Sequence, residues 1–471
     1  MNILHISAEC YPIAKVGGLA DVVGALPKYQ HKQHIKAAVL MPMYKTKFLY
    51  QNQWEHIFKG NANLADWFFE YNIIKLINND IGYDLYLLDI HNLLDRENVY
   101  GYSDDIERFV AFQIAACNWL TYLDIKPTVI HCHDHQTALI PFIIKHCSFY
   151  NQLASISTVL TIHNAQYQGN FSWEKSSLIP EWDTWKHGLL DWNNQINSLA
   201  AGIRCAEFVT TVSESYLYEM RQQSNGLEKL FEIEKGKSIG ILNGIDIDEW
   251  NPEKDRYLDL HFNHQNVNEK KPLIKKQFCE EFGLDYNKPL FVFIGRFVYE
   301  KAADILVESV ISSLYNTDFK INFYILGSGD NYIENDIRFQ SERFKHNVGN
   351  WIGYNERMGR RAYAAADYLL MPSRVEPCGL NQLYSLRYGT IPLVRNTGGL
   401  KDTVIDVGEN GFGFKFNQAS VDDIVYSIHR ATGMYYNDPT TFNIIRQRIM
   451  QIDHSWESVV NAYQQLYTKL I

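Results

Sequence analysis

Short apolar runs recur along the chain, with helix-like segments between them. The first group of runs, each of which we expect to form a strand, spans residues 2–7, 37–42, 84–90, 128–134, 157–164 and 208–213. Between two of these runs, apolar side chains recur at spacings typical of one helix face, at Phe109, Phe112, Ala116 and Trp119. Strands that alternate with helices predict a parallel sheet with helices on both faces.

The same alternation restarts in the second half of the chain. Residues 240–272 are polar and weakly periodic, and we interpret them as the connection between two domains. New strand-like runs follow at 289–296, 321–330, 347–354, 367–373 and 390–396. The last periodic segment, 455–471, predicts a terminal helix. The pattern therefore predicts an α/β protein with two doubly wound domains in series.

One short motif occurs twice. "VGGLADVV" (16–23) and "TGGLKDTV" (397–404) agree at five of eight positions, and each follows a strand-like run. The repeat is consistent with two related halves. The glycines alone also fit a simple turn between a strand and a helix. Lys15, which precedes only the first copy, distinguishes the two.

Length and composition agree with a large globular protein. The chain of 471 residues is too long for one ordinary core, and its 46% hydrophobic and 21% charged residues are normal for a folded protein. The net charge of −10 argues against nucleic acid or a membrane surface as a partner. A phosphate ligand therefore needs a local basic pocket.

Cysteine usage and the N-terminal segment bear on location. The seven cysteines form no CxxC pair and are odd in number, which favours a reducing compartment over a disulfide framework or a zinc ribbon. Residues 1–10 predict a first strand, not a signal peptide, because polar side chains interrupt the apolar run. We therefore expect a soluble, cytoplasmic protein.

Polar side chains follow several predicted strands, where parallel α/β sheets bind ligands. Lys15, Gly17 and Gly18 follow the first strand, where backbone N–H groups and a lysine suit an anion. Arg296 and Lys301 follow the run 289–296 and suit a diphosphate. Two alternatives remain. Lys15, Gly17 and Gly18 also fit a simple glycine turn, and Arg296 and Lys301 also fit a solvated loop in which they pair with Glu300 and Asp304.

A third cluster precedes a predicted helix. Glu376, Pro377 and Cys378 come just before an apolar-periodic segment that begins at Leu380. Helix N–H groups at this point could hold a phosphate, with Glu376 beside it. Alternatively, Glu376 is a capping carboxylate and Cys378 a buried small side chain.

Histidines form a fourth cluster. His131, His133, Asp134 and His135 lie at one predicted strand end, and His163 lies at the next. A metal site is conceivable, but the spacing favours contacts from Asp134 and His163 to a ligand hydroxyl, and no metal is predicted. The chain has no G-x-S-x-G elbow or complete Walker sequence, and "GSGDN" lacks the third glycine of a dinucleotide fingerprint.

Taken in order, these stretches resemble the bacterial glycogen synthase and plant starch synthase family. The motifs that carry the resemblance are "SAECYPIAKVGGLADVVGALP", "HCHDHQTALIP", "TIHNAQYQG", "GILNGIDIDEWNP", "IGRFVYEKAAD" and "SRVEPCGLNQLYSLRYGTIPLVRNTGGLKDTV". The resemblance runs from residue 3 to about residue 467, and its most specific part is the block 373–404.

The resemblance implies a GT-B fold, in which two Rossmann-like domains face a deep cleft. It implies a first domain at 1–245, to which the helix 455–471 crosses back, and a nucleotide-sugar-binding domain at 246–454. The implied activity is transfer of glucose, usually from ADP-glucose, to the non-reducing 4-hydroxyl end of an α-1,4-glucan such as glycogen, with retention of configuration. The family implies no metal and no other cofactor.

Motif matches also imply residue roles. Residues of the first domain that would approach the donor phosphates and glucose are Lys15, Gly17, Gly18 and Asp21. Those that would bind the diphosphate from the second domain are Arg296, Lys301, Gly379, Leu380 and Asn381. Those that would surround the glucosyl group are Asp134, His163, Asn243, Glu376 and Cys378. Tyr354 would lie against the nucleobase.

The implied chemistry is stabilisation of a departing diphosphate. Retention without an obvious pair of nucleophilic carboxylates suggests attack on the same face as the donor bond breaks. Lys15, Arg296 and Lys301 would stabilise the leaving group. Glu376 and the backbone carbonyl of His163 would position and stabilise the sugar. Groups divided between two domains imply closure before reaction, which excludes water.

Four departures from the family pattern affect the expected donor: Val16, Ala302, Asn381 and "DHQT" at 134–137. Because of these departures, the sequence does not decide between ADP-glucose and UDP-glucose as the donor. A sucrose-synthase-like transferase and a glucan-binding protein without activity also stay open as functions. Trp173, Trp182 and Trp185 form either a lip on the acceptor side or core packing.

Overall fold

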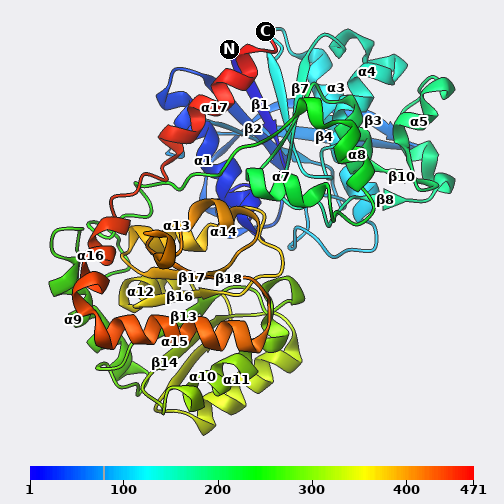
Figure 1. The fold of residues 1–471 in the computed structure, drawn as a ribbon. Coiled ribbons are helices and arrows are strands. Elements are labelled where there is room, and N and C mark those ends of the chain that lie inside the picture. Colours follow the sequence, from blue (N-terminus) through cyan, green and yellow to red (C-terminus); the bar gives the residue numbers. More distant parts are fainter. Residues whose placement is uncertain (78–79) are drawn as a thin grey trace. The chain divides into compact units, whose positions relative to one another are not determined.

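The computed structural model describes residues 1–77 and 80–471. The chain forms two compact units (Figure 1). The first unit contains residues 1–244 and 456–471, and the second contains residues 245–455. The C-terminal segment therefore belongs to the same unit as the N-terminus.

A large sheet forms the centre of the first unit. Its strands are β1 (Asn2–Ile6), β2 (Lys36–Pro42), β3 (Trp54–Leu64), β4 (Trp67–Leu76), β5 (Asp84–Asp89), β6 (Val129–His133), β7 (Ser157–Ile162), β11 (Phe208–Thr211) and β12 (Ser238–Gly240). Their order is β12-β11-β7-β6-β1-β2-β5-β4-β3. The pairs from β12 to β5 are parallel, and β4 and β3 add an antiparallel edge.

Helices pack around this sheet. They are α1 (Gly18–Lys32), α2 (Lys47–Gln51), α3 (Asp105–Tyr122), α4 (Ile140–His146), α5 (His187–Leu190), α6 (Ser198–Cys205), α7 (Glu214–Met220), α8 (Glu228–Ile233) and α17 (Trp456–Thr468). A small antiparallel sheet contains β8 (Asn170–Phe171), β9 (Asp191–Trp192) and β10 (Gln195–Asn197).

The terminal helix predicted at 455–471 is α17. Its side chains Val460, Tyr463 and Tyr467 are buried in one cluster with Ile3 and Leu26, from β1 and α1. Figure 1 shows α17 beside α1. The last helix thus completes the core of the first unit.

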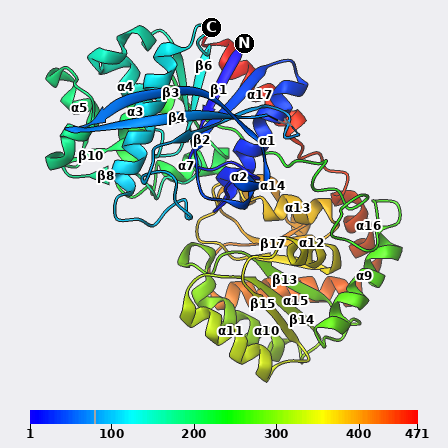
Figure 2. The ribbon, with the colours of Figure 1, turned by 180° about the vertical axis from the view of Figure 1, so that it is seen from behind.

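The hairpin of β3 and β4 was not predicted. β3 buries only Leu64, and its other side chains are exposed or half-buried, so it contains none of the buried apolar runs by which the other strands were predicted. Figure 2 shows this hairpin along α3, which it contacts. The other strands of the first group match the predicted runs within about two residues at each end.

The second unit has a fully parallel sheet. Its strands are β13 (Leu290–Ile294), β14 (Asn322–Gly327), β15 (Val348–Ile352), β16 (Tyr368–Met371), β17 (Ile391–Arg395) and β18 (Phe414–Phe416). Their order is β15-β14-β13-β16-β17-β18. This is the 3-2-1-4-5-6 order of a Rossmann sheet. The order in which successive strands are added reverses between β13 and β16, while all strands stay parallel.

Helices cover both faces of this sheet. They are α9 (Val267–Glu281), α10 (Leu306–Asn316), α11 (Asn331–Arg343), α12 (Glu356–Ala365), α13 (Asn381–Arg387), α14 (Gly398–Thr403), α15 (Val421–Asn437) and α16 (Pro439–Ile449). Contacts join α9 to α12 and α16, and α10 to α11 and α15 (Figure 1).

The interpretation of 240–272 as one connection is wrong for most of its length. Residues 245–272 belong to the second unit. Leu258 and Phe262 are buried in its core, and α9 begins at Val267. The segment before α9 is irregular and contains few buried apolar side chains, so it produces no periodic signal.

Within 1–77 and 80–471, no helix combines the length and the apolar character that crossing a membrane requires.

Candidate active site

A charged pair lies where two central strands of the second unit end. Lys301 ends the short helix η5 (Tyr299–Lys301) after β13, and Glu376 follows β16. Lys301 Nζ lies 2.5 Å from Glu376 Oε2, and Ser373 Oγ donates to the same oxygen at 2.8 Å. Glu376 is 7% exposed. This buried carboxylate and its lysine lie at the reversal point of the sheet, where Rossmann-like sheets bind ligands.

Arg296 lies in the same loop as Lys301 and is exposed. Within the described residues it forms no hydrogen bond and no ion pair. Its guanidinium is therefore available to an anionic ligand, whereas Lys301 already has a carboxylate partner.

Arg374 joins the two loops that carry Lys301 and Glu376. Its guanidinium binds both carboxylate oxygens of Asp304, at 2.5 and 2.9 Å. It also donates to the Tyr299 carbonyl at 2.8 Å, and its own N–H donates to the Glu300 carbonyl at 2.7 Å. Asp304, expected as a possible partner of the basic loop, pairs instead with Arg374. Sequence analysis missed this arginine, although it stands in "SRVEPCGL".

Ala302 adopts a backbone conformation that suits glycine. Its φ is +54° and its ψ is 34°, and its side chain is fully buried. An alanine in this left-handed region costs roughly 1–2 kcal/mol relative to ordinary conformations. Glycine, which lacks a Cβ, adopts this left-handed conformation without that cost.

The second copy of the repeated motif supports the Glu376 loop. The N–H of Gly399 reaches the Glu376 and Pro377 carbonyls, both at 3.1 Å. A Cβ on Gly398 would lie 2.0 Å from the Glu376 oxygen, and one on Gly399 would lie 2.1 Å from the Cys378 oxygen. These glycines therefore allow a close approach of two backbone segments.

Four of the remaining predicted residues of this unit follow Glu376 closely in the sequence, and the fifth, Tyr354, follows β15. Cys378 is buried, and Gly379 has a φ of +72°. Leu380 is the N-cap of α13, and Asn381 Nδ2 donates to the Ile294 carbonyl at 2.6 Å. Tyr354 is 74% exposed, and its hydroxyl donates to Glu356.

In the first unit, the loop before α1 folds around a buried acid. Glu9 Oε2 accepts from the N–H groups of Val16, at 2.6 Å, and Gly17, at 3.0 Å, and Oε1 accepts from the Tyr100 hydroxyl at 2.8 Å. Burial raises the pKa of the Glu9 carboxyl, and these hydrogen bonds oppose the rise. The anion that these N–H groups meet is therefore Glu9, which sequence analysis missed.

The other predicted groups of this loop are exposed or paired. Lys15 Nζ lies 2.7 Å from Asp21 Oδ1. Gly17 is the N-cap of α1, and Gly18 is its first residue. Apart from Gly17 itself and its neighbours in the chain, no atom of the described residues lies within 4 Å of a Cβ built on Gly17. Gly17 thus faces open space, in contrast to Gly398 and Gly399.

Asp134 and His163 meet at the carboxyl edge of the first sheet. Asp134 Oδ1 accepts from the N–H of His163 at 2.7 Å, and Asp134 has a φ of +56°. Burial raises the pKa of Asp134 to about 7. Asn243, close after β12, is 6% exposed, and its Oδ1 has no hydrogen-bond partner within the described residues. An orphaned buried acceptor of this kind suits a ligand hydroxyl.

Three buried histidines gather below this edge. His5, His131 and His133 have ring nitrogens within 4.8 Å of one another, the arrangement in which a metal is conceivable. All six ring nitrogens already form hydrogen bonds, to Gln30, Tyr467, Thr161, His163 and one another. The donor set therefore favours a polar network over a metal centre.

The tryptophans of segment 172–190 differ in environment. Trp173 stacks on His187 at 4.0 Å and donates to Asp191, whereas Trp185 is 91% exposed. Core packing is therefore wrong for Trp185.

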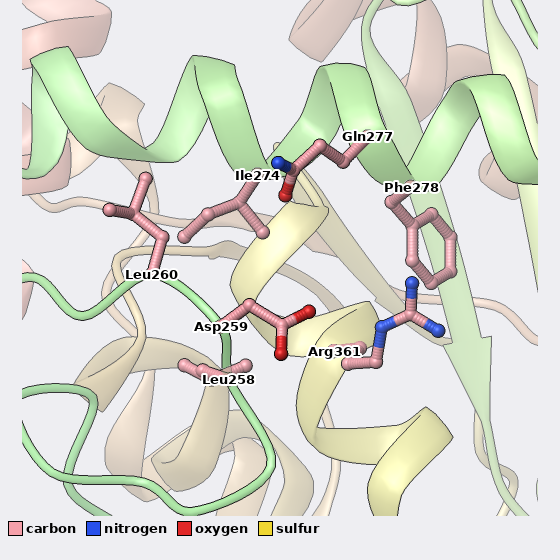
Figure 3. A pocket seen from close by; sticks show the side chains of 7 residues that line it. All are labelled: Leu258, Asp259, Leu260, Ile274, Gln277, Phe278 and Arg361. Atoms are coloured by element: carbon pink, nitrogen blue, oxygen red, sulfur yellow. The ribbon is translucent and has the colours of Figure 1, made fainter.

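A pocket on the second unit lies away from the predicted residues. Figure 3 shows it between α9, α12 and the segment 258–260, with Asp259 and Arg361 in its wall. Arg361 already pairs with Glu281. None of the seven lining residues is a predicted site residue.

Comparison with known proteins identifies the class. Residues 2–233 match the starch synthase catalytic domain, and residues 275–432 match the glycosyl transferases group 1. The catalytic domain of starch synthase IV from Arabidopsis thaliana, bound to ADP and acarbose, is similar with a TM-score of 0.91 and 30% identity, over 100% of this chain and 99% of that one. The chain is a GT-B glycosyltransferase with two Rossmann-like domains, as predicted.

Full-length relatives identify the family. A glycogen synthase of Flavobacterium johnsoniae is 50% identical over 100% of this chain and 99% of its own length. A glycogen synthase of Streptococcus pneumoniae is 35% identical over the whole of both chains. The chain belongs to the glycogen and starch synthase family and is a glucosyltransferase, which confirms the resemblance. Sucrose-phosphate synthase from Thermosynechococcus elongatus, with a TM-score of 0.65 and 16% identity, shares the fold.

Proposed function

We propose that this glucosyltransferase uses ADP-glucose and extends the non-reducing 4-hydroxyl end of an α-1,4-glucan with retention of configuration. The observation that carries the proposal is the Lys301–Glu376 pair, 2.5 Å apart at the sheet's reversal point. The similarity to a starch synthase domain bound to ADP supports the choice of nucleotide.

In the second unit, the proposal assigns diphosphate binding to Arg296 and Lys301. Arg296 is exposed and unpaired within the described residues, so it can bind an incoming phosphate without breaking a contact. Lys301 would exchange part of its contact with Glu376 for a phosphate oxygen. A positioned cation is most useful as the sugar–oxygen bond breaks and charge develops on the leaving diphosphate.

Glu376 would then face the developing charge on the sugar. Its carboxylate, which Ser373 holds by a hydrogen bond, can stabilise an oxocarbenium-like carbon. Cys378 would contact the glucosyl group, and the N–H groups of Gly379 and Leu380 would face the phosphates, with Asn381 beside them. Tyr354, exposed beside α12, would stack on the nucleobase.

The first unit would contribute hydroxyl contacts and one more cation. Lys15, Gly17, Gly18 and Asp21 are assigned to the donor, with Lys15 leaving Asp21 for a phosphate. The glucosyl hydroxyl groups are assigned to Asp134, His163 and Asn243. The orphaned Oδ1 of Asn243 supports this assignment, because a sugar hydroxyl would satisfy it.

A donor comparison tests the proposal. Initial rates of glucosyl transfer to glycogen are measured with ADP-, UDP- and GDP-glucose, and the product linkage is determined with an α-1,4-specific glucosidase. The proposal expects the highest kcat/KM with ADP-glucose and an α-1,4 product. A preference for UDP-glucose, transfer to a small sugar such as fructose, or no transfer would each overturn it.

The proposal includes a cytoplasmic location. Within the described residues, all seven cysteines are free and buried, which suits a reducing compartment. Fractionation of cells with an antibody against the chain tests this, since enrichment outside the cytoplasm would contradict it.

A further inference from the structure

A chain of hydrogen bonds connects α1 to His163 through the interior of the first unit. Gln30 Oε1 lies 2.9 Å from His5 Nε2, and His5 Nδ1 lies 3.0 Å from His133 Nε2. His133 Nδ1 in turn lies 3.0 Å from His163 Nε2. The first three side chains are fully buried, and His163 is 9% exposed. Water therefore cannot substitute freely for any link of the chain.

At neutral pH, the three histidine rings in this series of hydrogen bonds are neutral. Burial lowers the pKa of His5 to about 4 and that of His163 to about 3, and it lowers the pKa of His133 as well. A neutral imidazole has one N–H donor and one acceptor nitrogen. Each ring between two partners must therefore donate to one and accept from the other. The donor or acceptor at one end of the series thus fixes which nitrogen is protonated in every ring.

Gln30 sets that direction. Its Nε2 donates to the Tyr467 hydroxyl at 3.2 Å, which leaves Oε1, an acceptor, toward His5. His5 must then carry its proton on Nε2 and accept at Nδ1. His133 consequently donates from Nε2 and accepts at Nδ1, and His163 donates from Nε2.

We propose that Gln30, His5 and His133 are positioning residues that hold His163 in its Nε2-protonated tautomer. The remaining nitrogen, His163 Nδ1, is then an acceptor, which fits a ligand hydroxyl and rejects a carbonyl or phosphate oxygen. Its use for a sugar hydroxyl rests on the proposed function, but the tautomer itself does not.

The terminal helix takes part in the same network. Tyr467 of α17 accepts from Gln30, and its own hydrogen therefore points to His131 Nδ1, 2.7 Å away. His131 must then carry its proton on Nε2, which faces Thr161 Oγ1 at 2.6 Å. The network thus predicts the same tautomer for His131 and His163.

Nitrogen NMR of the full-length protein tests the relay. Long-range ¹H–¹⁵N correlation spectra of histidine-labelled protein at neutral pH report the tautomer of each ring, with signals assigned through His163→Gln and His131→Gln. We expect Nε2 protonation at both positions. Nδ1 protonation of His163 in the wild-type protein would overturn the proposal, and this outcome is decided without any variant of Gln30.

A variant then tests the role of Gln30. Gln30→Met keeps the side-chain length and removes the amide, and Gln33→Met, close to the end of α1 with an exposed contact to the Glu457 carbonyl, is the matched control. We expect Gln30→Met to give mixed His163 tautomers and a three- to tenfold higher KM for the sugar-nucleotide donor, with a much smaller change in kcat, since one hydrogen bond is affected. Gln33→Met should change neither.

Unchanged tautomers in a folded Gln30→Met would overturn the role of Gln30. A shifted tautomer with an unchanged donor KM would overturn the role of Nδ1 in binding. If the tautomers are as expected but no nucleotide sugar serves as a donor, the proposed function fails and the relay stands.

Discussion

Arg374 holds Asp304 with two guanidinium nitrogens, at 2.5 and 2.9 Å from the two carboxylate oxygens. Asp304 follows the turn that carries Lys301, and Arg374 lies two residues before Glu376. The pair therefore fixes the distance between the two groups that the proposed mechanism needs most.

Asp304→Asn should consequently impair catalysis more than stability. The side chains are 20% and 41% exposed, so the ion pair contributes only about 1 kcal/mol or less to unfolding. We expect kcat to fall by roughly tenfold, because small displacements of catalytic groups are costly. The combined exchange Arg374→Asp with Asp304→Arg should recover part of kcat. Wild-type kcat in Asp304→Asn would contradict this role.

Gly17 and Gly399 should respond differently to alanine. Gly17→Ala meets open space and extended backbone, so the free energy of unfolding should stay within about 0.5 kcal/mol of wild type. Its KM for ADP-glucose should rise if the donor approaches this loop. Gly399→Ala places Cβ against the Cys378 carbonyl and should destabilise the second unit by about 2 kcal/mol or more. Urea denaturation compares them, and equal destabilisation would contradict the assignment.

Ala302→Gly should stabilise the protein. The left-handed conformation of Ala302 costs an alanine roughly 1–2 kcal/mol, and glycine loses roughly 0.5–1 kcal/mol through backbone entropy. A gain of up to about 1 kcal/mol is expected in urea denaturation. Ala303→Gly, at the next residue, is the control and should destabilise. Loss of stability in Ala302→Gly would show that the strain is absent.

Asp134 should make stability depend on pH. Its pKa is about 7 in the folded chain, against an ordinary 3.8, because burial disfavours the carboxylate. Between pH 4 and pH 7 the folded chain therefore holds a proton that the unfolded chain has released, and the free energy of unfolding falls as the pH rises. Asp134→Asn should lose this component, so the wild-type minus variant difference should decline across that interval and level off above it. If the difference between wild type and variant in the free energy of unfolding stays constant from pH 4 to pH 7, the pKa of Asp134 is not raised in the folded chain.

Periodicity predicted most of the two sheets because their central strands are short, buried and bounded by helices. The hairpin β3–β4 escaped prediction because β3, at the sheet edge, contains no buried apolar run and β4 mixes buried with exposed positions. Residues 245–272 escaped because the irregular part of this segment has too few buried side chains, such as Leu258 and Phe262, to show a period.

The positions of Lys301 and Glu376 after central strands were predictable, because a motif places charge there, and their roles in catalysis stay a prediction. The contacts of Arg374 and Gln30 were not predictable, since each acts through a partner far away in the sequence, and those of Glu9 depend on how the loop before α1 folds back on it. Gln30 and His5 are 25 residues apart, and Arg374 and Asp304 are 70 apart. Only the folded chain brings these partners together.

The most direct test measures glucosyl transfer from ADP-glucose to glycogen by Lys301→Ala and Glu376→Ala, each compared with wild type at saturating glycogen. Loss of a group that stabilises the transition state costs about 3 kcal/mol, so each variant should lose roughly a hundredfold or more in kcat/KM. Both should retain a cooperative unfolding transition. Undiminished transfer by both folded variants would contradict the assignment of the Lys301–Glu376 pair as the catalytic centre.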